Sequence, residues 1–103
     1  MSIIGSQFKI NVHLEPINDI HLDSCSFVCT FFTSSNKYIT IDKKDMKKVD
    51  EDNYVALIDS SLLSVGNIKM TINIDIPDKD FPSGYRKEIK TVNTNIVICA
   101  KDV

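Results

Sequence analysis

Residues 66–99 read GNIKMTINIDIPDKDFPSGYRKEIKTVNTNIVIC, and this stretch decides the fold. Apolar and polar side chains alternate in its first part, where the apolar ones are Ile68, Met70, Ile72, Ile74 and Ile76. A period of two residues, held over nine residues, predicts a strand with one buried face and one solvated face. We therefore predict that Ile72 and Ile74 point into a hydrophobic core.

The alternation stops at Pro77, because proline has no N–H to donate to a neighbouring strand. Residues 77–84 contain two prolines and a glycine, which is typical of a loop. From about residue 86 to residue 100 the chain reads as extended again. The two long strands and their loop predict a hairpin at the centre of a β domain.

The rest of the chain is built from shorter extended segments. Alternating apolar residues predict a strand over residues 8–14, and residues 26–33 are apolar on both faces, which is typical of a central strand. Short strands are expected over residues 38–41 and 53–58. Two other segments are expected to be irregular: residues 42–52 as a charged, solvated loop that blunts a sheet edge, and residues 59–63 as a single helical turn capped by Asp59.

About seven short strands, with turns every 8–12 residues and no sustained helical period, predict an all-β fold. Two packed antiparallel sheets bury both inner faces, so we expect an immunoglobulin-like antiparallel β-sandwich of about seven strands. We expect residues 1–7 to form an N-terminal arm and residues 8–103 to form the single sandwich domain.

The composition of the chain argues against nucleic-acid binding and against membrane binding. The chain has 103 residues, 43% of them hydrophobic, and a formal net charge of −2. A nucleic-acid-binding domain usually carries a strong basic excess, so we expect no nucleic-acid partner. No apolar run is long enough to span a bilayer, and the first residues lack the basic and apolar regions of a signal peptide, so we expect no membrane partner.

The three cysteines are Cys25, Cys29 and Cys99. An odd number excludes a fully paired intramolecular framework. Cys25 and Cys29 would lie on one strand face about 13 Å apart, which is too far for a disulfide, whereas Cys99 could reach either one across a sheet. We expect three reduced, buried thiols in a protein assembled in a reducing cytoplasm.

Three groups of polar residues carry side chains that could bind a metal ion or a phosphate. Asp75, Asp78 and Asp80 could ligate Ca²⁺, but Lys79 lies among them and an Asx-type turn is the favoured interpretation. The histidines, His13 and His21, show no metal-ligand spacing and are expected at the surface. The lysines of residues 43–48 could contact phosphate, but the acidic residues 50–52 follow at once, which favours a solvated loop.

The sequence contains no motif that places a base beside a serine or cysteine nucleophile, and its three glycines form no phosphate-binding loop. We therefore expect that the protein is not an enzyme and binds no cofactor.

Interaction residues are expected at two places. Phe81, Tyr85 and Arg86 flank the predicted hairpin loop, and these residue types are enriched at interface hot spots. An alternative stays open, in which Phe81 caps the core and Arg86 pairs with Asp78 or Asp80. The second place is the arm, where Ile3 and Ile4 lie outside any expected strand.

The loop carries a pattern, I/V-P-D-x-D-F-x-x-G-x-R-x-E, that resembles small proteins encoded in the structural-gene regions of phages and prophages of gut Bacteroidetes, including the crAss-like phages. It is matched by Ile76, Pro77, Asp78, Asp80, Phe81, Gly84, Arg86 and Glu88. Those proteins are similar in outline to the immunoglobulin-like domains of phage baseplates and head decorations.

The resemblance implies a non-enzymatic virion component, without indicating which part of the virion. We expect a head-fibre or capsid-decoration component, assembled in the host cytoplasm. Its expected partners are copies of itself, as a dimer or trimer, and other virion proteins. Two alternatives stay open: a tail or baseplate adaptor, and a β-sandwich module that binds carbohydrate or peptide.

Overall fold

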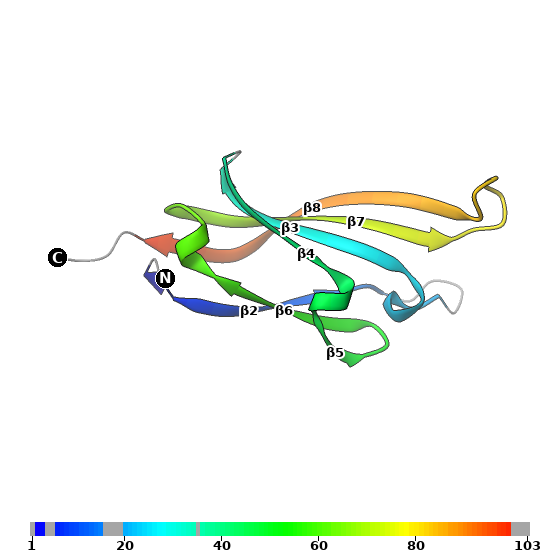
Figure 1. Ribbon diagram of the computed structural model, residues 1–103, viewed down its shortest axis with the longest axis horizontal. Coiled ribbons are helices and arrows are strands. Elements are labelled where there is room, and N and C mark those ends of the chain that lie inside the picture. The colour runs from blue at the N-terminus through cyan, green and yellow to red at the C-terminus, as the bar shows by residue number, and fades with distance from the viewer. Residues whose placement is uncertain (1, 4–5, 16–19, 35, 100–103) are drawn as a thin grey trace.

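The computed structural model describes residues 2–3, 6–15, 20–34 and 36–99 (Figure 1). Its strands are β1 (Ser2–Ile3), β2 (Gln7–His13), β3 (Ser26–Ser34), β4 (Lys37–Asp42), β5 (Lys47–Asp50), β6 (Asn53–Asp59), β7 (Gly66–Pro77) and β8 (Tyr85–Cys99). Three single 3₁₀ turns lie between them: η1 (Leu22–Ser24), η2 (Lys43–Asp45) and η3 (Ser60–Leu62). Within the described residues there is no helix of the length and apolarity needed to cross a bilayer.

The strands form two facing sheets, so the predicted all-β sandwich of about seven strands is confirmed. The larger sheet has the order β1-β8-β7-β3-β4 and the smaller one the order β2-β6-β5. All strand pairs are antiparallel except β1 with β8. In an antibody constant domain the second and fifth strands are neighbours in one sheet. Counted from β2, the corresponding strands here are β3 and β6. They lie in different sheets, because β3 is placed between β7 and β4 in the larger sheet.

The core lies between the two sheets and is centred on β3 and β7. Both are flanked by strands on two sides, which explains why their inner faces are the most apolar in the chain. Ile72 is 7% exposed and Ile74 is 2% exposed, so the prediction that both point into the core is confirmed. Phe27 packs edge-on against Tyr54 of the smaller sheet, with 5.2 Å between ring centroids.

The outer face of the larger sheet carries one threonine from each of its four long strands in a single row. The row runs Thr40, Thr30, Thr71, Thr91 across β4, β3, β7 and β8. Its outer pairs are hydrogen bonded through their hydroxyls, at 3.2 Å between Thr30 and Thr40 and 2.9 Å between Thr71 and Thr91. Cross-strand threonine pairs of this kind stabilise a solvated sheet face.

Residues 42–52 differ from the predicted loop, because they contain the turn η2 and the short edge strand β5. Lys43 is not solvated as expected: its Nζ donates to the carbonyl oxygens of Asp23 at 2.7 Å and Cys25 at 2.8 Å. The Asp23 carboxylate in turn accepts from Lys48 Nζ at 2.8 Å and from the Tyr54 hydroxyl. The polar groups of η1 are therefore satisfied by the charged segment, which the sequence pattern did not indicate.

The N-terminal residues also differ from the predicted arm. Ser2 and Ile3 form β1, which pairs in parallel with the end of β8 in the register Ser2 with Ile98 and Ile3 with Cys99. This part of the arm therefore belongs to the sandwich itself. Ile4 lies outside the described residues.

Two smaller predictions concern η3 and the cysteines. The Asp59 side chain accepts from Ser61 N at 2.9 Å, so the predicted capped turn is confirmed. Cys25 and Cys29 are buried free thiols, and burial raises the pKa of Cys29 to about 12. The side chain of Cys99 is outside the part of the chain that the structure describes.

Candidate interaction surface

The two strands of the β7–β8 hairpin present different side chains to the same face of the sheet. Four cross-strand pairs share the inner face, and they are Ile76 with Arg86, Ile74 with Glu88, Ile72 with Lys90 and Met70 with Val92. The β7 member of each pair is buried in the core. The β8 members are charged or, in Val92, 46% exposed. The inner face of β8 is therefore left open where that of β7 is covered.

The position of β8 in the sheet explains this difference. Of the described residues, only Ser2 and Ile3 pair with its second edge, and they do so at Ile98 and Cys99. The smaller sheet has three strands against four long ones in the larger sheet, and in Figure 1 the β7–β8 hairpin reaches past it. Residues 85–93 of β8 consequently form a long free edge with a polar inner face.

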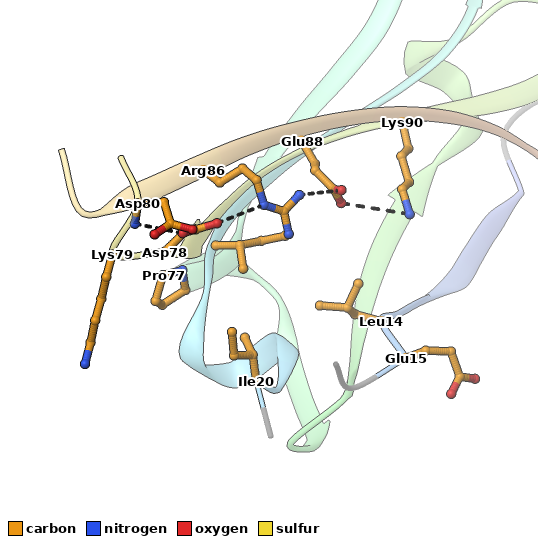
Figure 2. A pocket seen from close by; sticks show the side chains of 11 residues that line it. Leu14, Glu15, Ile20, Pro77, Asp78, Lys79, Asp80, Arg86, Glu88 and Lys90 are labelled. Carbon is orange, nitrogen blue, oxygen red and sulfur yellow. Dashed lines mark hydrogen bonds and ion pairs between the residues drawn. The ribbon is translucent and has the colours of Figure 1, made fainter. Parts of the chain in front are cut away.

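The charges on this inner face alternate and are paired along the strand (Figure 2). Arg86 Nη1 donates to Glu88 Oε1 at 2.6 Å, and Arg86 Nε lies 3.5 Å from Asp78 Oδ2. Lys90 Nζ is 4.0 Å from Glu88 Oε2. The hydrogen bond that Arg86 donates to the Glu88 carboxylate is the main cause that raises the pKa of Arg86. All of these groups are about a third exposed or more except Asp78, so the row stays accessible to a partner.

A cleft of about 460 Å³ lies between this row and the end of the smaller sheet. Its apolar wall comes from Leu14 and Ile20 on one side and from Ile76 and Pro77 on the other, while the charged row lines its upper rim in Figure 2. A cleft with an apolar floor and a few fixed charges can hold an extended peptide or a small polar ligand.

A second groove of about 400 Å³ continues the cleft along the free edge of β2. The two share Leu14, Glu15 and Lys90, and the second is lined mainly by apolar side chains of β2 and β7 together with Val92. On this side the sandwich is thus open from the hairpin end as far as Asn11 of β2 and Val92 of β8.

The loop at the hairpin end is held by its own hydrogen bonds. Asp78 N donates to Gly84 O at 2.9 Å, Gly84 N donates to Phe81 O at 2.9 Å, and Asp80 N donates to the Asp78 side chain at 3.0 Å. Gly84 adopts φ 82°, in the left-handed region that glycine enters without strain. On this closed turn Phe81 is 45% exposed and Tyr85 is 52% exposed.

The expected interaction residues fall into two separate places. Phe81, Tyr85 and Arg86 all lie at the hairpin end, with Tyr85 and Arg86 on opposite faces of β8, but Ile3 lies beside Cys99 at the opposite end of β8. One contact surface therefore does not contain both groups. The open alternative is resolved in part: Arg86 pairs with Asp78, whereas Phe81 is not part of the core.

The three aspartates do not converge. Asp75 points to the outer face, where Lys87 Nζ lies 3.9 Å from its Oδ1, and Asp78 is engaged with Arg86 and the Asp80 N–H. The part of the chain that the structure describes contains no cluster of three metal-ligating side chains. The favoured interpretation of this segment as an Asx-type turn is confirmed.

The two histidines have different surroundings. His13 is exposed as predicted and contacts Asn53 Oδ1 at 2.9 Å and Glu15 Oε1 at 3.1 Å, contacts that raise its pKa. His21 is only a third exposed, with its Nδ1 2.8 Å from Asp52 Oδ1. His21 therefore also lies at the surface, but it is partly covered and paired with Asp52.

Sequence reasoning did not single out Glu88, Lys90 and Val92 as parts of the surface. The signal was present, because these residues follow Arg86 at a spacing of two and must share its face of the strand. Comparisons with protein-family models, with curated proteins and with solved structures gave no match for this chain.

Proposed function

We propose that this protein is a non-enzymatic component of a phage virion, of the head-fibre or capsid-decoration type. It acts by self-association and by docking to other virion proteins in particles assembled in the host cytoplasm. The resemblance of the loop to virion proteins suggests the class, and the exposed aromatic pair at the hairpin end supports docking.

One observation carries the docking part of the proposal. Phe81 and Tyr85 are about half exposed on and beside a turn that is held by backbone–backbone hydrogen bonds and by one from Asp80 N to the Asp78 side chain. Aromatic side chains displayed on an ordered turn lose little conformational entropy on binding and bury a large area. The hairpin end therefore has the properties of an anchor that enters a pocket on another protein.

The test is incorporation into particles. Virions are assembled in cells that supply either the wild-type chain or the Phe81→Ala/Tyr85→Ala double variant, and the chain is quantified in purified particles by mass spectrometry. We expect the double variant to lose about tenfold or more in incorporation, since each hot-spot truncation typically costs over about 1 kcal/mol. Equal incorporation of both chains contradicts docking through the hairpin end.

Tyr38→Ala is the matched control. Tyr38 is 59% exposed on β4, at the opposite edge of the larger sheet from β8. The Tyr38→Ala substitution removes a similarly exposed aromatic side chain and leaves the hairpin end unchanged, so incorporation should stay at the wild-type level. Absence of the wild-type chain from purified virions contradicts the virion role as a whole.

The cleft supports a second candidate, a module that binds peptide or carbohydrate. Its volume of about 460 Å³ is within the range of ligand sites, and it combines apolar walls with the Arg86–Glu88 charges. Arrays of glycans and peptides separate the two candidates. Specific binding that is lost in Arg86→Ala, by a chain that virions do not incorporate, favours the second.

A further inference from the structure

The free edge of β8 is complementary to itself. We propose that two copies of this chain pair antiparallel through β8, with a two-fold axis at Ile89, so that their larger sheets join into one continuous sheet. This inference rests on the self-association that the proposed function includes, and it names the surface and the register.

The main-chain groups of β8 point alternately toward β7 and toward the free edge. Asp78 N donates to Gly84 O at the hairpin end, and the β7–β8 register continues from there without a shift to Asn93. In an antiparallel ladder, hydrogen-bonded and non-hydrogen-bonded pairs alternate. Counting by two from Gly84, the even-numbered residues of β8 bond to β7. The odd-numbered residues 85–91 therefore direct their N–H and C=O groups toward the free edge.

The free edge is regular and ends at a bulge. Residues 85–93 contain no proline and no irregularity, so they offer an uninterrupted ladder to a partner strand. The regular part ends at a bulge over residues 94–96, where Asn95 has φ 65° and Thr94 Oγ1 donates to Ile68 O at 2.7 Å. Beyond the bulge β8 pairs with β1. The bulge thus separates an edge that is occupied within the chain from one that is open to another chain.

The side chains of β8 favour one register for the pairing of two copies. With the axis at Ile89, the two Ile89 residues face each other as a hydrogen-bonded pair, and each Glu88 lies opposite the partner copy's Lys90. Ile89 is 62% exposed, so the pairing covers an apolar side chain that the single chain leaves in water. The Glu88–Lys90 pairs are non-hydrogen-bonded pairs, in which side chains are closest. Opposite charges at such positions stabilise a sheet.

Neighbouring registers are less favourable. An axis at Lys87, Glu88 or Lys90 places that residue directly opposite its own copy, and like charges in this position repel. An axis at Thr91 avoids the repulsion, but it removes the Glu88–Lys90 pairs and brings the partner strand onto the bulge at Asn95. The axis at Lys87 also brings Arg86 opposite Glu88, but only the axis at Ile89 combines opposite charges, matched hydrogen-bonding groups and a regular ladder without a like-charged pair at the axis.

Charged residues on an inner strand face can instead protect an edge against pairing. That alternative predicts a chain that stays monomeric, which makes the oligomeric state the direct test. Sedimentation from micromolar to millimolar protein should show a monomer–dimer equilibrium. A chain that remains monomeric at millimolar concentration overturns the proposal.

Cysteine cross-linking tests the register. Ile89→Cys should form a disulfide-linked dimer under mild oxidation, because Cα atoms of a hydrogen-bonded antiparallel pair are about 5.5 Å apart, within the range for a disulfide. Lys87→Cys is the matched control on the same face: two copies of residue 87 would lie about 13 Å apart and should not cross-link. Mixing Lys87→Cys with Thr91→Cys should restore cross-linking, since these residues lie opposite each other in the proposed register.

Wild-type protein, oxidised in parallel, measures any cross-linking through the native cysteines. If Lys87→Cys alone cross-links as fast as Ile89→Cys, or if the mixture does not cross-link, the register is wrong.

Charge exchange tests the side-chain pairs. In the Glu88→Lys dimer, the new lysine of each copy lies opposite Lys90 of the other copy, so the dimer contains two like-charged pairs. The substitution should weaken dimerisation about tenfold or more. The exchange variant Glu88→Lys/Lys90→Glu restores opposite charges and should return to within about threefold of wild type. If the exchange variant dimerises no better than Glu88→Lys, the pairing is contradicted.

These results are independent of the virion test. A dimer that cross-links through Ile89 but is not incorporated into particles upholds the edge pairing and contradicts the virion role. A strictly monomeric chain that is incorporated into particles upholds the virion role and contradicts the edge pairing.

Discussion

β7 and β8 are the two strands of one hairpin, they pair residue by residue, and they differ in what covers them. β7 lies between β8 and β3, and its inner face is buried along its whole length, from Ile68 to Ile76. β8 shares that face through the cross-strand register, yet over residues 86–92 its inner side chains are charged or half exposed.

The difference shows that burial depends on the opposite layer as much as on the strand itself. The smaller sheet covers β7 but not the free edge at β8, so the same sheet face is core on one strand and surface on the next. On the covered strand, β7, every second residue is apolar and faces inward. On the uncovered part of β8, the residues that face inward are mostly charged. The predictions that follow test this contrast.

The largest effect is expected from one substitution made on both strands at the same level of the sheet. Ile72→Asp places an unpaired carboxylate in the core and should cost about 4 kcal/mol or more, out of a total of about 5–15 kcal/mol. Lys90→Asp, at the cross-strand partner of Ile72, should cost less than about 1 kcal/mol. Urea unfolding followed by circular dichroism, at low protein concentration, measures both.

A soluble Ile72→Asp protein that unfolds cooperatively at the wild-type midpoint contradicts the burial of β7. A Lys90→Asp protein as unstable as Ile72→Asp means that the inner face of β8 is covered in the single chain.

A smaller effect is expected at the bulge that divides β8. Asn95 has φ 65°, a conformation that costs most side chains about 1–2 kcal/mol and that asparagine tolerates better. Its N–H donates to the Asn93 side chain at 2.9 Å. Asn95→Ala should therefore lower the free energy of unfolding by about 1 kcal/mol, whereas Asn95→Gly should lower it less. Thermal unfolding of the two variants, compared with wild type, measures the difference.

If alanine and glycine have equal effects, the left-handed conformation at residue 95 is not what holds the bulge.

The smallest effect is expected at the β2 side of the open groove. Contacts with Glu15 and Asn53 raise the pKa of His13 in the folded chain. Its protonated form is therefore favoured by folding. This stabilisation is fully present below the ordinary pKa of 6.5 and is lost as the pH rises through the raised value. Melting temperatures measured across this range should fall slightly with rising pH, and His13→Gln should remove that slope. An unchanged slope in His13→Gln assigns it to another group.

The sequence pattern was sufficient for β7 because its periodicity, length and terminal proline all indicate the same structure. It was sufficient for the turn at Asp59 because the capping interaction is local. It failed for Lys43 and for β1, whose partners lie far away in the chain: Asp23 and Cys25 for the lysine, and the end of β8 for Ser2–Ile3. Such pairings depend on the tertiary arrangement, which no window of neighbouring residues contains.

The candidate surface was predicted in the same uneven way. Residue type identified Phe81, Tyr85 and Arg86, because aromatic residues and arginine on a loop are frequent at interfaces. The charged row beyond Arg86 could not be predicted in this way. Its prediction requires knowing that residues 85–93 of β8 form a sheet edge that the smaller sheet does not cover, and residue periodicity does not encode strand order.

The place of β3 in the larger sheet has a consequence for how fast the chain folds. The hairpins β3–β4, β5–β6 and β7–β8 join strands that are close in the sequence, and such hairpins form within about 1–10 μs. The β2–β6 and β3–β7 ladders, in contrast, join residues roughly forty to fifty positions apart, so each must close a long loop before it gains any contact. We therefore expect a slow refolding step, on the order of milliseconds to seconds, in which preformed hairpins dock through β3 and β7.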